Sequence, residues 1–188
     1  GATVSLSALP DEGSEFVLWD GSITSQNNTI EFEIDGDINL SAEFRLLTYS
    51  IDCSADPSNG GTTEGCGEFK FGETANLNAI PAAGWEFVNW TESGNEVSNK
   101  KEYSFTVNNN RNLTANFRPQ TFTVNCSVDP SGGGVTEGCG NYSFGETVNL
   151  TATPNTGYNF VNWTEDGKVI SSEINISFTV SGNRNIIA

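Results

Sequence analysis

An internal repeat constrains this 188-residue chain more than any other feature of its sequence. Residues 48–115 align with residues 121–188 without a gap, and 38 of the 68 paired positions are identical. Self-similarity of this kind indicates tandem structural units that share one fold. A partial third copy lies near the start, where residues 3–19 match 74–90 and residues 38–44 match 111–117.

The copies predict three domains: a partial repeat over residues 1–47, a complete repeat over 48–118, and a repeat over 119–188. Ala188 corresponds to Ala115, which Asn116 and Phe117 follow in the complete copy. We therefore expect the last repeat to lack its final two residues and the first to begin in mid-repeat, as in an excised piece of a longer chain.

Within each repeat the hydrophobic pattern has the period of β-strands. Apolar or β-branched residues alternate with polar ones, and glycine and proline separate the runs. The alternating segments are residues 112–117, 121–128, 146–154, 158–163 and 174–180. We expect an all-β unit of five or six mostly antiparallel strands. The joins at 45–47 and 118–120 are too short to be flexible tethers, so the modules should stand end to end as a rod.

Aromatic residues that recur at equivalent positions predict the core of the unit. One phenylalanine and one tryptophan occur in all three copies, and the simplest role for such large side chains is a buried one, with each indole N–H hydrogen-bonded. These core candidates are Phe16, Trp19, Phe87, Trp90, Phe160 and Trp163. The alternative role for them is an exposed ligand platform.

One aromatic position varies between the copies. Ser14, Trp85 and Tyr158 occupy it in turn, and a site that accepts both serine and tryptophan is expected to be exposed. Trp85 and Tyr158 are therefore the candidates for stacking on a sugar ligand, although solvent-exposed residues without a ligand are the simpler interpretation.

Two cysteine pairs stand at the ends of a twice-written loop, CSADPSNGGTTEGC and CSVDPSGGGVTEGC. Cys53 and Cys66 lie symmetrically about Asn59-Gly60, and Cys126 and Cys139 lie symmetrically about Gly132-Gly133, so a tight hairpin would bring each pair together. The alternative is a longer loop, with the arms opened by Pro57 and Pro130. Twelve intervening residues and the absence of histidine argue against zinc, and an acidic strand-like setting argues against a redox dithiol. We predict two disulfides, each worth about 3 kcal/mol, and an oxidising compartment.

Charge and composition exclude several classes of function. With 24 acidic and 8 basic residues the chain has a formal charge of −16, which disfavours nucleic acid as a partner. No segment is long and apolar enough for direct membrane insertion, and no signal peptide is visible. Histidine, the commonest general base, is absent, so we expect no enzyme.

The repeat resembles a known family. Phe-Gly-Glu-Thr, then Gly-aromatic-x-Phe-x-x-Trp, then Phe-Thr-Val and a closing Asn-Leu-Thr-Ala-Asn-Phe are similar to the divergent internalin-type B-repeat, the Listeria–Bacteroides repeat of bacterial surface proteins. The match runs over Phe69–Trp90 and Ser104–Phe117, and again over Tyr142–Trp163 and Ser177–Val180. The resemblance implies a small β-grasp-like or related module in tandem on secreted or cell-surface proteins, without catalysis. The cysteine pair and the high acidity depart from the usual pattern.

Two functions remain open at this point. The first is a structural stalk or spacer of an extracellular or cell-surface bacterial protein, an adhesin or filament component, whose partners are its neighbouring repeats, other surface proteins or copies of itself. The second is a binding module in which Trp85 and Tyr158 stack on a glycan with help from calcium. Asp35 and Asp37 are the calcium candidates, although Asp-Gly-Asp lacks the rest of any EF-hand spacing, and no other cofactor is expected.

Overall fold

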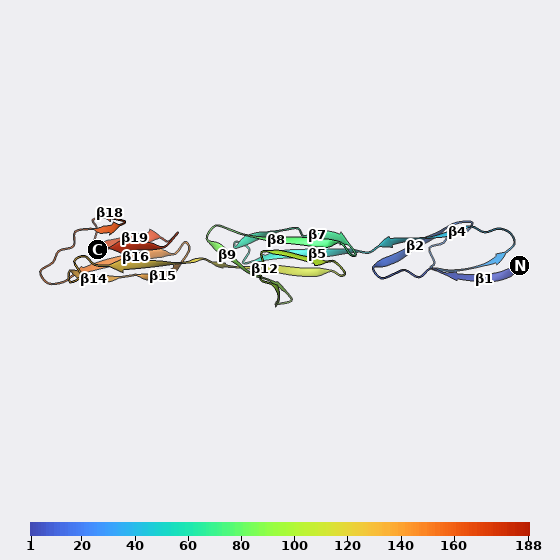
Figure 1. Ribbon diagram of the computed structural model, residues 1–188, viewed down its shortest axis with the longest axis horizontal. Helices are drawn as coiled ribbons and strands as arrows, with labels where there is room; N and C mark the ends of the chain where they lie inside the picture. Colours follow the sequence, from blue (N-terminus) through green and yellow to red (C-terminus); the bar gives the residue numbers. More distant parts are fainter. The chain divides into compact units, whose positions relative to one another are not determined.

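A computed structural model describes all 188 residues, and every regular element in it is a β-strand (Figure 1). The predicted fold class, an all-β chain of small modules in tandem, is confirmed. The structure contains no helix of the length and hydrophobicity needed to cross a membrane.

The middle repeat contains eight strands in two sheets. A five-stranded sheet has the order β10-β9-β12-β5-β7, and a three-stranded sheet has the order β11-β8-β6. Its strands are β5 (Thr48–Asp56), β6 (Gly61–Glu64), β7 (Gly67–Lys70), β8 (Thr74–Pro81), β9 (Trp85–Glu92), β10 (Asn95–Ser98), β11 (Glu102–Thr106) and β12 (Arg111–Pro119).

The last repeat has the same arrangement. Its sheets have the orders β18-β17-β20-β13-β15 and β19-β16-β14, which reproduce the middle repeat strand for strand. Its strands are β13 (Thr121–Ser127), β14 (Gly134–Glu137), β15 (Gly140–Ser143), β16 (Thr147–Pro154), β17 (Trp163–Glu165), β18 (Lys168–Ser171), β19 (Asn175–Thr179) and β20 (Arg184–Ile187). The first and last strands of this repeat, β13 and β20, pair in parallel.

The core of the last repeat draws on both of its sheets. Apolar side chains alternate along the strands, and the inward-facing ones meet between the sheets. The buried cluster consists of Val124, Val148, Leu150, Ala152, Trp163, Val180 and Ile186. The alternating sequence pattern thus places one layer of side chains in the core and leaves the other in water.

The first repeat is smaller. It has only β1 (Ala2–Ser7) paired with β3 (Thr29–Ile34) and β2 (Ser14–Gly21) paired with β4 (Leu40–Leu46). Strands equivalent to β5, β6, β7 and β10 are absent from it, and its buried cluster shrinks to Ala8, Trp19 and Ile30.

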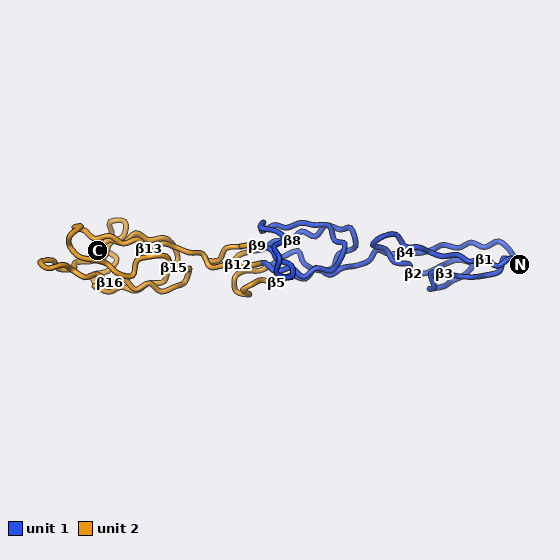
Figure 2. Tube along the Cα trace, turned by 90° about the horizontal axis from the view of Figure 1, so that it is seen from below, with its two compact units in different colours: residues 1–54, 63–79, 89–115 blue, residues 55–62, 80–88, 116–188 orange.

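Internal contacts divide the chain into two compact units, and the division runs through the middle repeat (Figure 2). Unit 1 comprises residues 1–54, 63–79 and 89–115, and unit 2 comprises residues 55–62, 80–88 and 116–188. Each unit contains one junction between successive repeats, so each junction is described within its own unit.

The strand count of a full repeat, eight, exceeds the five or six that we expected. The additional elements are the four-residue strands, such as β6 and its counterpart β14. They begin in glycine-rich segments that the sequence pattern marks as turns. At Gly61 a larger residue would clash with the neighbouring strand, because an added Cβ would lie 2.5 Å from the carbonyl oxygen of Ile80. Close approach of another backbone is a common reason for glycine within a strand.

The expected strand over residues 158–163 is wrong for most of its length. Only Trp163 at its end belongs to a strand, β17, and residues 158–162 are irregular. The equivalent strand β9 starts at Trp85 and lies beside β12, which continues to Pro119. In the last repeat β20, the counterpart of β12, ends at Ile187. Residues 158–162 therefore have no neighbouring strand with which to pair.

Candidate functional site: the junctions between repeats and a pocket in the last repeat

Both predicted cysteine pairs are disulfides in the structure. Cys53 bonds to Cys66 and Cys126 bonds to Cys139, with Cα–Cα distances of 6.0 and 5.9 Å. The expected hairpin geometry is wrong, however, because β6 does not pair with β5. It pairs in the other sheet, and β5 is instead paired with β7. Each disulfide therefore ties together the two ends of a loop that leaves one sheet, contributes a short strand to the other, and returns.

The candidate core aromatics fall into two groups. Trp90 and Trp163 are fully buried, and their indole nitrogens donate to the carbonyl oxygens of Lys101 and Ile174, at 3.1 and 3.4 Å. The three phenylalanines, Phe16, Phe87 and Phe160, are half-buried beside them. In the first and last repeats the phenylalanine ring lies 5.8 Å, centroid to centroid, from the tryptophan ring.

Trp19 departs from the expected pattern. It is 8% exposed, yet its indole nitrogen is buried without a hydrogen-bond partner. The segment from Trp19 to Asn28 is two residues shorter than the one from Trp90 to Lys101, whose carbonyl accepts the equivalent bond. An unmade hydrogen bond at a buried donor costs about 1–3 kcal/mol. The first repeat thus leaves a buried hydrogen-bond donor unpaired that the two full repeats pair.

A single residue joins the first repeat to the middle one. Leu47 stands between β4 and β5; its N–H donates to the carbonyl of Gly13 and its own carbonyl accepts from the N–H of Phe71, both at 2.8 Å. The ring of Phe71 lies directly over Gly13, where an added Cβ would collide with it. Gly13 also has a positive φ of 75°, which glycine adopts without strain.

The junction between the middle and last repeats has the same construction. Gln120 stands between β12 and β13, donates to the carbonyl of Gly84 and accepts from the N–H of Phe144, again at 2.8 Å. Phe144 covers Gly84, whose φ is 76°. From the sequence alone we did not identify these glycines as positions that a ring from the next repeat covers. The sequence signal was there: a Phe-Gly-Glu-Thr motif follows each short join.

An ion pair flanks each junction at the surface. Arg45 bonds to Glu15 and Arg118 bonds to Glu86, each at 2.6 Å, and the arginine side chains are 69% and 68% exposed. Exposed pairs of this kind contribute about 0–1 kcal/mol. The backbone bonds and the covering ring therefore hold the junction more firmly than these charges do.

A second, better shielded ion pair lies on the sheet of each full repeat. Arg111 bonds to Glu92 and stacks over the ring of Phe105, and Arg184 bonds to Glu165 and stacks over Phe178. The hydrogen bonds from the arginine lower the pKa of both glutamates below their usual value, despite partial burial that acts in the opposite direction. These groups stabilise the repeat and lie apart from the pocket described next.

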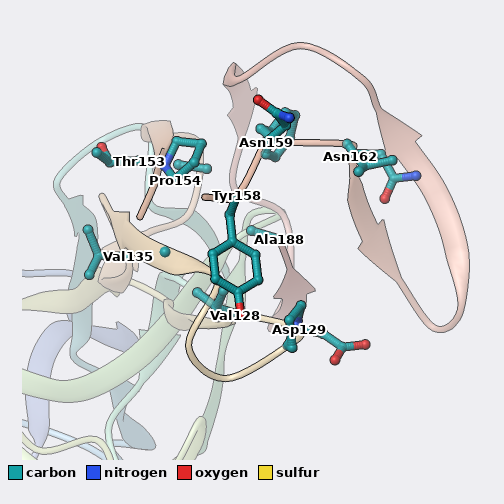
Figure 3. Close-up of a pocket in the computed structure, with 15 residues that line it drawn as sticks. Val128, Asp129, Val135, Thr153, Pro154, Tyr158, Asn159, Asn162 and Ala188 are labelled. Atoms are coloured by element: carbon teal, nitrogen blue, oxygen red, sulfur yellow. The ribbon is translucent and has the colours of Figure 1, made fainter. Parts of the chain in front are cut away.

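The two candidate stacking residues lie in different surroundings. Trp85 is half-buried and packs against Gly60, where an added Cβ would come within 3.1 Å of its ring. Tyr158 is 47% exposed and lines a cavity of about 270 Å³ in the last repeat (Figure 3). In Figure 3 its ring stands over the hollow near Val128, Val135 and Ala188.

The calcium candidates Asp35 and Asp37 are exposed in the bend between β3 and β4. No group of three or more histidine, cysteine, aspartate or glutamate side chains in the chain is arranged to hold a metal ion. Calcium binding at Asp35 and Asp37 stays a prediction.

Comparison with known families decides what kind of module this is. The divergent InlB B-repeat domain matches residues 1–47, 51–121 and 124–188. The chain belongs to this family. Tandem B-repeats are typical of bacterial surface proteins, and the three matched B-repeats follow the copies that the sequence itself displays.

No curated protein matches the chain. Among solved structures, one described as "The Bacillus anthracis TIE protein" aligns with 99% of this chain and 50% of its own length, at 9% identity and a TM-score of 0.37. The chain thus spans half the length of that structure, and a likeness at this score carries no argument about function.

Proposed function

We propose that this chain is a stalk or spacer segment of a secreted or cell-surface bacterial protein, an adhesin or filament component, whose task is to hold another domain at a distance. The observation that carries the proposal is the repeated junction. A spacer must fix the orientation of each module relative to the next, and a flexible tether leaves that orientation free.

The two junctions meet this requirement in the same way. Each consists of one residue whose N–H and C=O are both hydrogen-bonded to the flanking repeats. A backbone hydrogen bond contributes about 1 kcal/mol net, and a covering phenylalanine ring adds buried apolar surface. Each junction therefore opposes bending in more than one direction.

The disulfides support an extracellular location. Disulfides persist in oxidising compartments and are rare in the cytosol, and surface proteins carrying B-repeats are exposed to such conditions. The staples also compensate for the small core of a module of about 70 residues.

The alternative, a glycan-binding module with calcium, has one observation in its favour, the cavity beside Tyr158. Its counterpart Trp85 packs on Gly60, so the two aromatic residues do not form one repeated binding strip.

The test measures the stiffness of the second junction. Spin labels at Lys100→Cys and Glu173→Cys, two equivalent and exposed positions, report the distance between the middle and last repeats. We expect a narrow distance distribution in the native background. It should broaden in Gly84→Ala, which displaces Phe144, and broaden further when three glycines are inserted after Gln120.

Gly157→Ala is the matched control. Its φ of 87° imposes a similar backbone strain, but nothing lies within 4 Å of the added Cβ. The control should leave the distance distribution unchanged. A native distribution as broad as that of the glycine insertion would overturn the stalk proposal.

A further inference from the structure

A cleft opens at the first junction, on the surface of unit 1. It has a volume of about 450 Å³, and its lining residues all belong to that unit. They are Glu15, Arg45, Leu46, Leu47, Thr48 and Lys70. The cleft shares no residue with the cavity beside Tyr158, so the two are separate sites on the chain.

The strand register explains why these side chains border one cleft. Glu15 faces Arg45 across β2 and β4, and Thr48 faces Lys70 across β5 and β7. Only Leu47 separates β4 from β5, so the two cross-strand pairs stand at adjoining ends of their sheets. One carboxylate, one guanidinium, one ammonium and one hydroxyl are thereby brought together.

The two cations of the cleft have donors that the protein does not use. Arg45 bonds to Glu15 through Nε, at 2.6 Å, and its two Nη groups form no hydrogen bond within the chain. Lys70 donates only its backbone N–H, to Glu73 at 2.7 Å, and its ammonium belongs to no ion pair. Charges farther away than about 8 Å are largely screened at physiological salt. The lining groups, two cations and one anion, therefore set the local potential despite the formal charge of −16.

The opening strands of a full repeat do not cover this position. The side chains of Arg45 and Glu15 are 69% and 43% exposed in the first repeat, which lacks those strands. Their counterparts Arg118 and Glu86, in the middle repeat that has them, are 68% and 43% exposed. The ion pair is thus equally accessible in both settings, and its accessibility is a property of the junction.

The second junction keeps the ion pair but lacks the second cation. Ser143 occupies the position of Lys70, and Gln120 occupies that of Leu47. The backbone is the same at both junctions, because the N–H of Ser143 donates to a glutamate three residues later, as that of Lys70 does. The first junction therefore differs from the second by an ammonium group and an apolar side chain.

We propose that the cleft at the first junction binds an acidic saccharide, a sugar that bears a carboxylate. The Nη groups of Arg45 and the ammonium of Lys70 donate charge-assisted hydrogen bonds to that carboxylate. Glu15 and Thr48 accept hydrogen bonds from sugar hydroxyls, and Leu47 offers apolar surface to the ring. A single negative charge matches the excess of one cation in the lining. The proposal concerns a ligand at one junction and does not depend on the stalk function.

The experiment titrates the full chain with glucuronate and follows the backbone amides by NMR. We expect saturable shift changes at residues 45–48 and 70, which weaken as the salt concentration rises. Glucose has a similar ring without the carboxylate and should cause none of these changes. Acetate has the carboxylate without the ring and should bind at least about fivefold more weakly than glucuronate.

Lys70→Ser is the matched variant, because Ser143 shows that the position accepts serine with its backbone bond intact. The variant should weaken glucuronate binding about tenfold or more, through loss of a charge-assisted hydrogen bond. Ser143→Lys with Gln120→Leu should create binding at the second junction, with new shift changes at residues 118–121 and 143. Lys168→Ser, which removes an exposed lysine from another part of the chain, should leave the affinity unchanged.

Three results would overturn the inference. The first is the absence of saturable shift changes with glucuronate. The second is equal affinity for acetate, which would make the cleft a site for any carboxylate. The third is unchanged affinity in Lys70→Ser or no gain in the second-junction variant, either of which would show that these side chains do not form the site. The spin-label distances across the second junction test the stalk separately from all three.

Discussion

The middle and last repeats share the sequence Phe-Val-Asn-Trp-Thr-Glu, but only the middle repeat folds all of it into a strand. Both repeats have the same strand order, the same disulfide and the same buried tryptophan. They differ at the closing strand, where β12 runs to Pro119 and β20 ends at Ile187. Local sequence is therefore not sufficient to form this strand, and a hydrogen-bonding neighbour is required.

The comparison also separates the part of the repeat that forms without a complete closing strand from the part that needs one. The tryptophan layer and its surrounding cluster form in both repeats, so this part of the fold does not depend on residues beyond Ala188. The end layer, with its paired phenylalanines, forms only where the closing strand is complete. The B-repeat thus has an interior that forms without the last residues of the closing strand and an end layer that this strand completes.

The largest effect is expected from Phe117→Ala, which gives the middle repeat the open end of the last one. Truncation of a buried phenylalanine destabilises by about 3–5 kcal/mol. Urea unfolding should show this loss, and hydrogen exchange should accelerate over residues 85–89. Phe44→Ala is the matched control, because Phe44 is already 41% exposed and should lose less. Unchanged exchange at 85–89 would mean that the closing ring does not order this segment.

Removal of one disulfide should have the next largest effect. In the chain-entropy model a loop of this length contributes about 3 kcal/mol, so Cys53→Ser with Cys66→Ser should lower the unfolding free energy of the middle repeat by that amount. Cys126→Ser with Cys139→Ser should lower the unfolding temperature of the last repeat below that of the middle repeat in the first double variant, because the end of the last repeat is open. Calorimetry under non-reducing conditions separates the two. Identical thermal profiles for the two double variants would contradict the difference between the repeats.

The smallest effect is expected from acid, and it should be shared by both full repeats. The pKa of Glu92 and of Glu165 is lowered by hydrogen bonds from arginine, so each pair stabilises the fold above the unfolded pKa near 4.5 and loses that contribution as the pH falls through the lowered value. Glu92→Gln should reduce stability at pH 7 by about 1 kcal/mol or less. It should also flatten the dependence of stability on pH between about 5 and 2. Urea titrations at pH 7 and pH 3 measure both, and a steeper dependence in the variant would contradict the assignment.

Much of the fold could be predicted from the sequence because the copies test one another. The tryptophan that every copy keeps proved to be buried, as Trp90 and Trp163 show, whereas the phenylalanine kept in every copy is only half-buried. The short strands were missed because their glycines carry the usual signal of a turn. At Gly61 the reason for glycine is instead the close approach of a neighbouring strand, which no local pattern reveals.

The junction could not have been predicted from one repeat alone. Gly84 and Phe144 are 60 residues apart and belong to different copies, and each has an adequate local explanation, a turn for the glycine and a loop aromatic for the phenylalanine. Their contact depends on how a one-residue join orients successive modules. Composition and periodicity carry no information about that orientation.

The parallel pairing of β13 with β20 has a mechanical consequence. These are the first and last strands of their repeat, and they lie side by side. A force that pulls the two ends of the repeat apart loads their hydrogen bonds in shear, so that the bonds share the load and do not open one at a time. The Cys126–Cys139 bond carries the applied force directly between the two cysteines. The 12 residues between them, about 40 Å of extended chain, therefore cannot be stretched out by that force.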